Sequence, residues 1–224
     1  MIQPRFGKLN AMIHSQIDHL AVTAPSLEAG VDYVRRALGV PLQVGGEHPR
    51  MGTHNYVLKL GEKVYLEVIS INPAASAPDR PRWFDLDAPD PFRVPRLATW
   101  IVRTNDIQEA VSRSPIVSGH IEPMSRGDLN WKITIPKDGS LPLGGVVPTL
   151  IQWQDVHPAE ALQDFGCRLL RLEGFHPEAE RVNEVLATIG FQGEFSVTPL
   201  APGARPYLVA QIQTPTGERK IGSS

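Results

Sequence analysis

The sequence predicts an α+β protein built from repeated βαβββ units with mixed, curved sheets. Two observations predict this class. The order strand, helix, strand, strand, strand occurs twice, and the second copy follows the first by 80 residues. Each copy contains a single helix, which can cover only one face of its sheet. The other face therefore needs a partner or a ligand.

The first unit begins with a strand at residues 17–24, where branched side chains favour extended backbone. Ser26 suits the N-cap of the helix that follows, and Gly39 suits its end. Between them, apolar residues recur at helical spacing: Leu27, Val31, Val34 and Leu38. A short strand at 40–44 and a hairpin at 54–70 complete the unit.

The second unit repeats this order, and Asn105 caps its short helix. A third, partial βαββ copy has its elements at 168–175, 176–190, 194–201 and 206–214. The predicted organisation is a first module with an N-terminal arm at 1–72, a proline-rich linker at 73–96, a second module at 97–156 and a third partial module at 157–224.

The linker carries six prolines between residues 73 and 95 and is too long and stiff for a plain connection. Trp83 and Phe84 within it need burial. Two explanations fit these aromatic residues, and the sequence leaves both open. Either they fasten the linker to the sheet, or Trp83 overhangs the open side of the first sheet with Arg80 and Arg82 and contacts a ligand.

Composition excludes several classes of protein. The 224 residues carry a formal net charge of -2 without basic runs, which argues against a nucleic-acid surface. No apolar run approaches a membrane span, and the N-terminal residues do not read as a secretory signal. The single cysteine, Cys167, excludes an internal disulfide and fits a reducing compartment. We expect a cytoplasmic protein.

The register of the hairpin decides which side chains share a face. A two-residue turn at residues 61 and 62 would pair Tyr56 with Glu67 and His54 with Ile69. Because cross-strand partners share a face, one side would carry His54, Tyr56, Leu58, Tyr65, Glu67 and Ile69. The other side of the last strand is aliphatic, and we expect the helix to cover it.

Alternation along the first strand adds a second histidine to the open side. Leu20 and Val22 are apolar and suit the side that faces the helix. His19 would then point away from the helix, toward Glu67.

The set His19, His54 and Glu67 has the composition of a divalent-metal site for Zn, Ni, Mn or Fe. The alternative is a polar cavity in which His19 and Glu67 hydrogen-bond each other and Tyr56. In the absence of metal, Glu67 would serve as a general base. The candidate catalytic residues are therefore Glu67, His19 and Tyr56.

The stretch "GGEHPRMGTHNYVLKLG", followed by "VYLEVISINP", "RWFDLD" and "LIQW", is similar to glyoxalase-like proteins of bacteria. These proteins are members of the vicinal oxygen chelate superfamily, which includes glyoxalases, bleomycin-resistance proteins and dioxygenases. The resemblance covers residues 17 to about 155 and continues more faintly through the third unit. It implies paired βαβββ modules whose curved sheets enclose a metal site.

The resemblance also implies ligands on the first and last strands of each module. In the first module these positions are His19 and Glu67, whereas the second module has Thr99 and Gln152, which are not usual ligands. A metal would then need a one-sided site that includes His54, or a second chain that completes it in a homodimer. Without metal, the second sheet would offer a polar wall for substrate: Thr99, Arg103, Trp131 and Gln152.

Arg50 and His48 lie on a glycine-containing loop at the expected edge of the cavity. A loop arginine can bind a carboxylate or phosphate through two parallel hydrogen bonds, although the loop could equally be solvated. His120 and His157 have no convincing partners and are expected to be surface or capping histidines.

Two functions fit these features. The first is a small-molecule enzyme of the glyoxalase or dioxygenase type, in which a divalent ion would polarise two neighbouring oxygens of the substrate. The second is a non-catalytic binding protein of the same fold, in which Arg103 or Arg50 would supply the counter-charge for a small ligand. The missing ligands of the second module favour binding, and the clustered His and Glu of the first favour catalysis.

Overall fold

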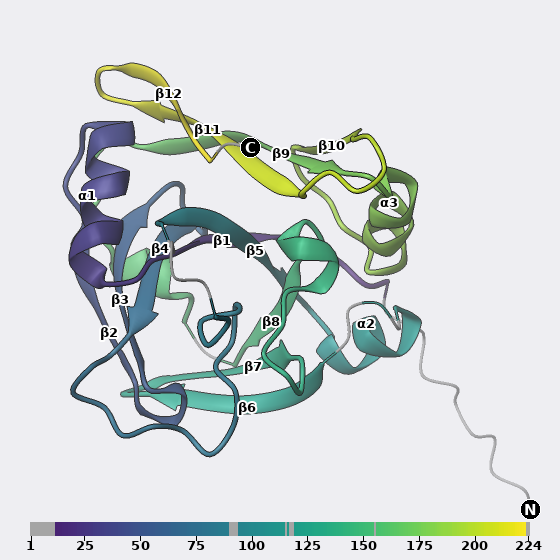
Figure 1. Ribbon diagram of the computed structural model, residues 1–224, viewed down its shortest axis with the longest axis horizontal. Coiled ribbons are helices and arrows are strands. Elements are labelled where there is room, and N and C mark those ends of the chain that lie inside the picture. The colour runs from purple at the N-terminus through teal and green to yellow at the C-terminus, as the bar shows by residue number, and fades with distance from the viewer. Residues whose placement is uncertain (1–11, 90–93, 115, 117–118, 155, 223–224) are drawn as a thin grey trace, which may run out of the picture.

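The computed structural model describes residues 12–89, 94–114, 116, 119–154 and 156–222 (Figure 1). Residues 1–11, which make up most of the N-terminal segment that does not read as a secretory signal, lie outside the described residues. No helix in the described part of the chain is both long and apolar enough to cross a membrane.

Two βαβββ units form the larger part of the molecule. The first contains β1 (Ser15–Thr23), α1 (Leu27–Leu38), β2 (Gln43–His48), β3 (Thr53–Lys59) and β4 (Tyr65–Ile71). The second contains β5 (Arg96–Thr104), α2 (Ile107–Arg113), β6 (His120–Arg126), β7 (Leu129–Ile135) and β8 (Thr149–Trp153). Short 3-10 turns lie at Pro49–Met51, Pro142–Gly145 and Pro158–Ala161.

Both units share one eight-stranded sheet in the order β2-β3-β4-β1-β5-β8-β7-β6. The first strand of each unit pairs in parallel with the last strand of the same unit, and β1 and β5 join the units by antiparallel pairing. The sheet curves so that its strands surround a common interior (Figure 1). The predicted α+β class with mixed, curved sheets is confirmed.

Helix α1 covers the convex face of the first unit, as the sequence predicts. The Ser26 side chain accepts a 3.2 Å hydrogen bond from the Ala29 amide, and Gly39 ends the helix at a φ of 71°. Val34 and Leu38 are fully buried against the same core that contains Leu20, Val22, Leu66 and Val68. The predicted helix-facing side of β1 and β4 is therefore correct.

The hairpin register predicted from the sequence is wrong by one residue. Leu60 donates its amide hydrogen to the Val64 carbonyl at 2.8 Å, so three residues lie in the turn rather than two. Glu67 consequently pairs with Val57, and Val68 pairs with Tyr56. Because neighbouring residues of a strand point to opposite faces, this slip reverses the whole of β3.

The third unit has a separate four-stranded sheet, in the order β10-β9-β11-β12. Its elements are β9 (Arg168–His176), α3 (Ala179–Thr188), β10 (Phe195–Pro199), β11 (Tyr207–Thr214) and β12 (Gly217–Ile221). It contains one strand more than the βαββ prediction. Its first strand lies inside the sheet between its second and third, so its topology differs from that of the first two units.

This third unit covers the convex face at β5, where α2 is too short to do so. Trp100 of β5 is fully buried, and its ring stacks on Phe195 with centroids 4.5 Å apart. The indole donates a 2.9 Å hydrogen bond to the Val146 carbonyl, which satisfies its only polar atom.

The N-cap of α2 is Asp106, not Asn105; the Asp106 side chain accepts from the Glu109 amide at 3.1 Å.

Candidate functional site

A cavity of about 440 Å³ lies inside the concave face of the large sheet. Both modules and the linker contribute to its walls. The first module supplies His19, His48, Asn55, Val57, Tyr65 and Glu67, the second supplies Arg126, Trp131, Ile133, Ile151 and Trp153, and the linker supplies Trp83 and Phe84. Its volume and mixed lining are those of a small-molecule site.

A β-bulge in β1 creates the polar end of this cavity. The pairing of β1 with β5 shifts register between Ile17 and His19, which leaves Asp18 as the extra residue. Ile17 packs in the convex core, while His19 lines the concave cavity. Regular alternation would turn Asp18 toward α1, but the bulge brings it beside His19 instead.

Asp18 is fully buried and accepts three side-chain hydrogen bonds. Its Oδ1 lies 2.6 Å from Nδ1 of His19, and its Oδ2 lies 2.9 Å from both Nε1 of Trp153 and Nε2 of His157. Burial alone would raise the pKa of Asp18, but the hydrogen bonds and charges of His157 and His19 outweigh it and hold this pKa below its usual value. Asp18 is therefore an ionised carboxylate.

An ionised Asp18 fixes the tautomer of His19. A carboxylate only accepts, so Nδ1 of His19 carries a hydrogen, and in the neutral imidazole Nε2 is then the basic nitrogen. Nε2 lies 3.7 Å from Oε2 of Glu67. The imidazole stacks on the Tyr65 ring with centroids 4.5 Å apart, which holds its plane. The predicted convergence of His19 and Glu67 on the concave side is therefore present.

Glu67 is held by Asn55, the residue that the corrected register brings to its side. Nδ2 of Asn55 donates to Oε1 of Glu67 at 2.5 Å, and Oδ1 of Asn55 accepts from the Gly46 amide at 2.7 Å. These two bonds fix the orientation of the amide. Gly45 makes room for it, because a Cβ at that position would overlap Oδ1 of Asn55.

Arg126 and His48 close the cavity where β6 approaches β2. A guanidinium nitrogen of Arg126 donates to Nε2 of His48 at 3.2 Å, so Nδ1 of His48 donates to the Thr53 hydroxyl at 3.1 Å. Burial lowers the pKa of His48 to about 4; the charge of Arg126 also lowers it, and that of Glu67 opposes the change. His48 is a neutral imidazole, and Arg126 is the cation of this cavity.

Burial also raises the pKa of Tyr65 well above its usual value, and the negative charges of Asp18 and Glu67 add to this effect. The Tyr65 hydroxyl is therefore neutral. Tyr65 lies on the face that the sequence predicts for it, beside Glu67, although the sequence assigned it no role.

Several predicted site residues lie elsewhere. His54 and Tyr56 turn away from Glu67 because of the register slip, so they do not line the cavity. Gln152 also points away: its Oε1 accepts from the Ile107 amide and its Nε2 donates to the Asn105 carbonyl, both at 3.0 Å.

Thr99 and the two expected counter-charges are also outside the cavity walls. Thr99 is fully buried, and its hydroxyl donates to the Trp100 carbonyl at 3.4 Å. Arg50 is bound to Glu122 at 2.5 Å, and Arg103 lines a different cavity.

Trp83 and Trp131 do line the cavity, as expected. Trp83 is 4% exposed, stacks on Phe84 with centroids 5.5 Å apart and meets the edge of the His48 ring at 5.2 Å. Trp83 therefore fastens the linker and forms part of the cavity wall, whereas Arg80 and Arg82 pair with Glu122 and Asp87 and are not among the residues that line the cavity.

Four residues of the site were not predicted from the sequence: Asp18, Asn55, Arg126 and Trp153. His157 was expected at the surface or at a cap. It does accept from the Ala159 amide at 3.2 Å at the start of a 3-10 turn, but it is buried and bound to Asp18. The available signal was the adjacent pair Asp18-His19, since a carboxylate beside a histidine often orients it.

The donor set does not fit a resident divalent metal. His19 and Glu67 offer two ligands, and the described residues contain no group of three or more His, Cys, Asp or Glu side chains placed to hold an ion. Glu67 already bonds Asn55, and the same cavity contains the Arg126 cation. A set of three protein ligands or more is usual for such sites.

Paired βαβββ modules around a concave cavity are the arrangement expected of a glyoxalase-like protein of the vicinal oxygen chelate superfamily. The model of the glyoxalase-like domain matches residues 17–190, so the chain belongs to this family. The resemblance seen in the sequence is confirmed. No curated protein matches the chain.

Solved structures show partial likeness. A hypothetical protein from Staphylococcus aureus has a TM-score of 0.49 at 11% identity, covering 94% of this chain and 86% of that chain. A Streptomyces coelicolor methylmalonyl-CoA epimerase in complex with 2-nitronate-propionyl-CoA has a TM-score of 0.42 at 19% identity, covering 62% and 97%. A methylmalonyl-CoA epimerase from Mycobacterium tuberculosis has a TM-score of 0.39 at 12% identity, covering 61% of this chain and 85% of that chain. The family assignment depends on the domain match alone.

Proposed function

We propose that the protein is a small-molecule enzyme that moves a proton on a carbonyl-containing substrate, with His19 as the base. The observation that carries this proposal is the buried Asp18–His19 pair, whose free Nε2 faces Glu67 across 3.7 Å at the polar end of the cavity. An imidazole held by a carboxylate is a common general base.

The proton balance of such a reaction uses only groups of this chain. Nε2 of His19 would take a proton from the carbon next to the carbonyl, and Asp18 would stabilise the resulting imidazolium. Glu67 could receive that proton on Oε2 and return it to the substrate at the same or a neighbouring carbon. The net reaction is an isomerisation, or a lyase reaction if a leaving group departs from the enolate.

The remaining walls suggest which substrates would fit. Arg126 would stabilise the enolate oxygen or a carboxylate of the substrate. Trp83, Trp131 and Trp153 offer apolar surface and exclude water from the reacting carbon. We therefore expect a small carbonyl compound with one negatively charged group and an apolar part.

The test is hydrogen exchange at carbon. The purified protein is incubated in D₂O with a panel of 2-oxo acids, hydroxyketones and acyl thioesters, and loss of the α-proton signal is followed by NMR. We expect exchange with at least one compound, reduced by about 100-fold or more in His19→Ala and in Glu67→Gln. The matched control is His120→Ala, which removes an exposed histidine of β6.

Two results would contradict parts of this proposal. Exchange that persists in His19→Ala contradicts the assignment of the base. Binding of a compound without exchange by the unmodified protein favours the alternative, a non-catalytic small-ligand-binding protein, for which the aromatic walls are the supporting observation.

A further inference from the structure

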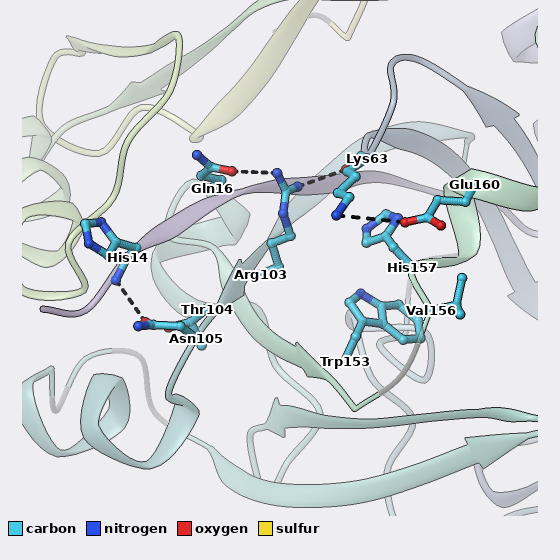
Figure 2. A pocket seen from close by; sticks show the side chains of 10 residues that line it. All are labelled: His14, Gln16, Lys63, Arg103, Thr104, Asn105, Trp153, Val156, His157 and Glu160. Carbon is cyan, nitrogen blue, oxygen red and sulfur yellow. Dashed lines mark hydrogen bonds and ion pairs between the residues drawn. The ribbon is translucent and has the colours of Figure 1, made fainter. Parts of the chain in front are cut away.

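A second cavity of about 650 Å³ shares Trp153, Val156 and His157 with the first (Figure 2). We call it the outer cavity. It is lined by His14, Gln16, Lys63, Arg103, Thr104, Asn105, Trp153, Val156, His157 and Glu160. The proposed reaction makes no use of it.

Three neutral oxygens hold Arg103 in this cavity, and Figure 2 shows two of these contacts, with Gln16 and Lys63. Its Nη1 donates to the Ile17 carbonyl and, at 2.9 Å, to the Lys63 carbonyl. Its Nη2 donates to Oε1 of Gln16 at 2.6 Å. These acceptors belong to β1 and to the β3–β4 turn, so the guanidinium is fixed before any ligand binds.

The bonds of Arg103 leave two of its five N–H donors, one on Nε and one on Nη2. Adjacent donors on these two nitrogens match the two oxygens of a carboxylate or phosphate. Within the part of the chain that the structure describes, no carboxylate forms an ion pair with Arg103.

The charge of Arg103 is only partly compensated. Half-burial lowers the pKa of Arg103, and the charge of the more distant Asp18 raises it. Glu160, the acid that lines the cavity, lies 3.8 Å from the Lys63 ammonium, and both of these side chains are about half exposed. A half-buried cation without a direct anionic partner gains stability when an anion binds it.

From this arrangement we propose that the outer cavity binds the anionic group of a small molecule, a carboxylate or a phosphate, on the free edge of Arg103. Asn105 and Thr104 add polar groups to the cavity wall, and Trp153 provides a flat apolar surface for the remainder of the ligand. Anion binding at Arg103 does not depend on the reaction proposed for His19, because it requires no turnover.

The test is a calorimetric titration of the full-length protein with succinate and, separately, with inorganic phosphate, in a buffer without either anion. We expect saturable binding of one of them, and the one that binds identifies the anion class. The absence of saturable binding for both up to about 10 mM would overturn the proposal.

Variants locate the site. Arg103→Met should weaken binding by about tenfold or more. Gln16→Glu is the sharper test, because a glutamate can keep the hydrogen bond to Nη2 while neutralising the guanidinium. It should remain folded and lose binding to the same extent. The matched control is Arg219→Met, which removes an exposed arginine whose bonds also go to neutral oxygens.

The two variants together show whether the anion binds at Arg103. Loss of binding in Gln16→Glu with a wild-type melting temperature, and retention in Arg219→Met, support the outer cavity. Unchanged binding in Gln16→Glu, or an equal loss in Arg219→Met, would place the anion elsewhere on the surface and overturn the proposal.

Discussion

His19 and His157 bind opposite oxygens of one carboxylate, that of Asp18, at 2.6 and 2.9 Å. His19 lines the 440 Å³ cavity, and His157 lines both this cavity and the outer cavity. Trp153 supplies a third bond to the same carboxylate. Asp18 thus fixes both the base of the proposed reaction and the wall behind it.

Replacing this carboxylate tests its positioning role. In Asp18→Asn, the amide can donate to Nδ1 of His19, which would shift the hydrogen of the imidazole to Nε2 and remove the lone pair from the cavity. We expect proton exchange to fall about 100-fold, with a smaller change in ligand affinity. The pH profile of the residual exchange should also change, which a purely structural role would not produce.

The same substitution should destabilise the fold. The amide introduces two N–H groups where the carboxylate had none, and only one of them can donate to His19, so the other is buried without a partner at a cost of about 2 kcal/mol. Asp32→Asn on the exposed side of α1 is the control for charge alone. Wild-type exchange in Asp18→Asn would show that this carboxylate does not orient His19.

The sequence carried enough information to place α1 and the concave sides of β1 and β4. Period-2 alternation put Leu20 and Leu66 on the helix side and His19 and Glu67 on the other. Those assignments depend on local alternation within one strand. They do not depend on how strands are aligned with one another, and for that reason they agree with the structure.

Assignments that depended on alignment between strands failed. The turn after β3 has three residues rather than two, and this change exchanged Tyr56 for Asn55 beside Glu67. The position of Asp18 in the site could not be predicted, because the bulge in β1 interrupts the alternation. A bulge is a tertiary feature that is selected by pairing with β5, so period-2 alternation alone could not place it.

The corrected register makes its own prediction. Asn55→Ala removes the bond to Glu67 and leaves the Gly46 amide without its acceptor, which should cost about 1–3 kcal/mol of unfolding free energy. Proton exchange should fall as well, because Glu67 is no longer held. Tyr56→Phe should leave both quantities unchanged, since Tyr56 faces away from the cavity. Chemical denaturation and the exchange assay measure the two effects. A larger loss in Tyr56→Phe than in Asn55→Ala would contradict the three-residue turn and support the two-residue turn predicted from the sequence.

The donor set predicts the effect of a chelator. Because His19 and Glu67 are two ligands beside the Arg126 cation, we expect neither the melting temperature nor proton exchange to change after dialysis against EDTA. Added Zn²⁺, Ni²⁺, Mn²⁺ or Fe²⁺ should not raise the melting temperature. A chelator-sensitive melting temperature, lost in His19→Ala, would mean that a ligand comes from residues outside the described part of the chain or from a second copy.

The neutral His48 predicts how stability depends on pH. Its pKa is lowered from 6.5 to about 4 by burial, so below about pH 6.5 the unfolded chain binds a proton that the folded protein does not. The contribution of His48 is therefore complete above about pH 6.5, decreases as the pH falls and is lost near pH 4. The full shift corresponds to roughly 3 kcal/mol as an upper bound.

His48→Gln isolates this contribution, because the amide can accept from Arg126 and donate to Thr53 but does not titrate in this range. The unfolding free energy of the wild-type protein should fall more steeply than that of His48→Gln between about pH 6.5 and pH 4. Urea denaturation at a series of pH values measures both slopes. Parallel slopes would mean that His48 is protonated in the folded protein, which would remove the acceptor that holds Arg126 at the cavity.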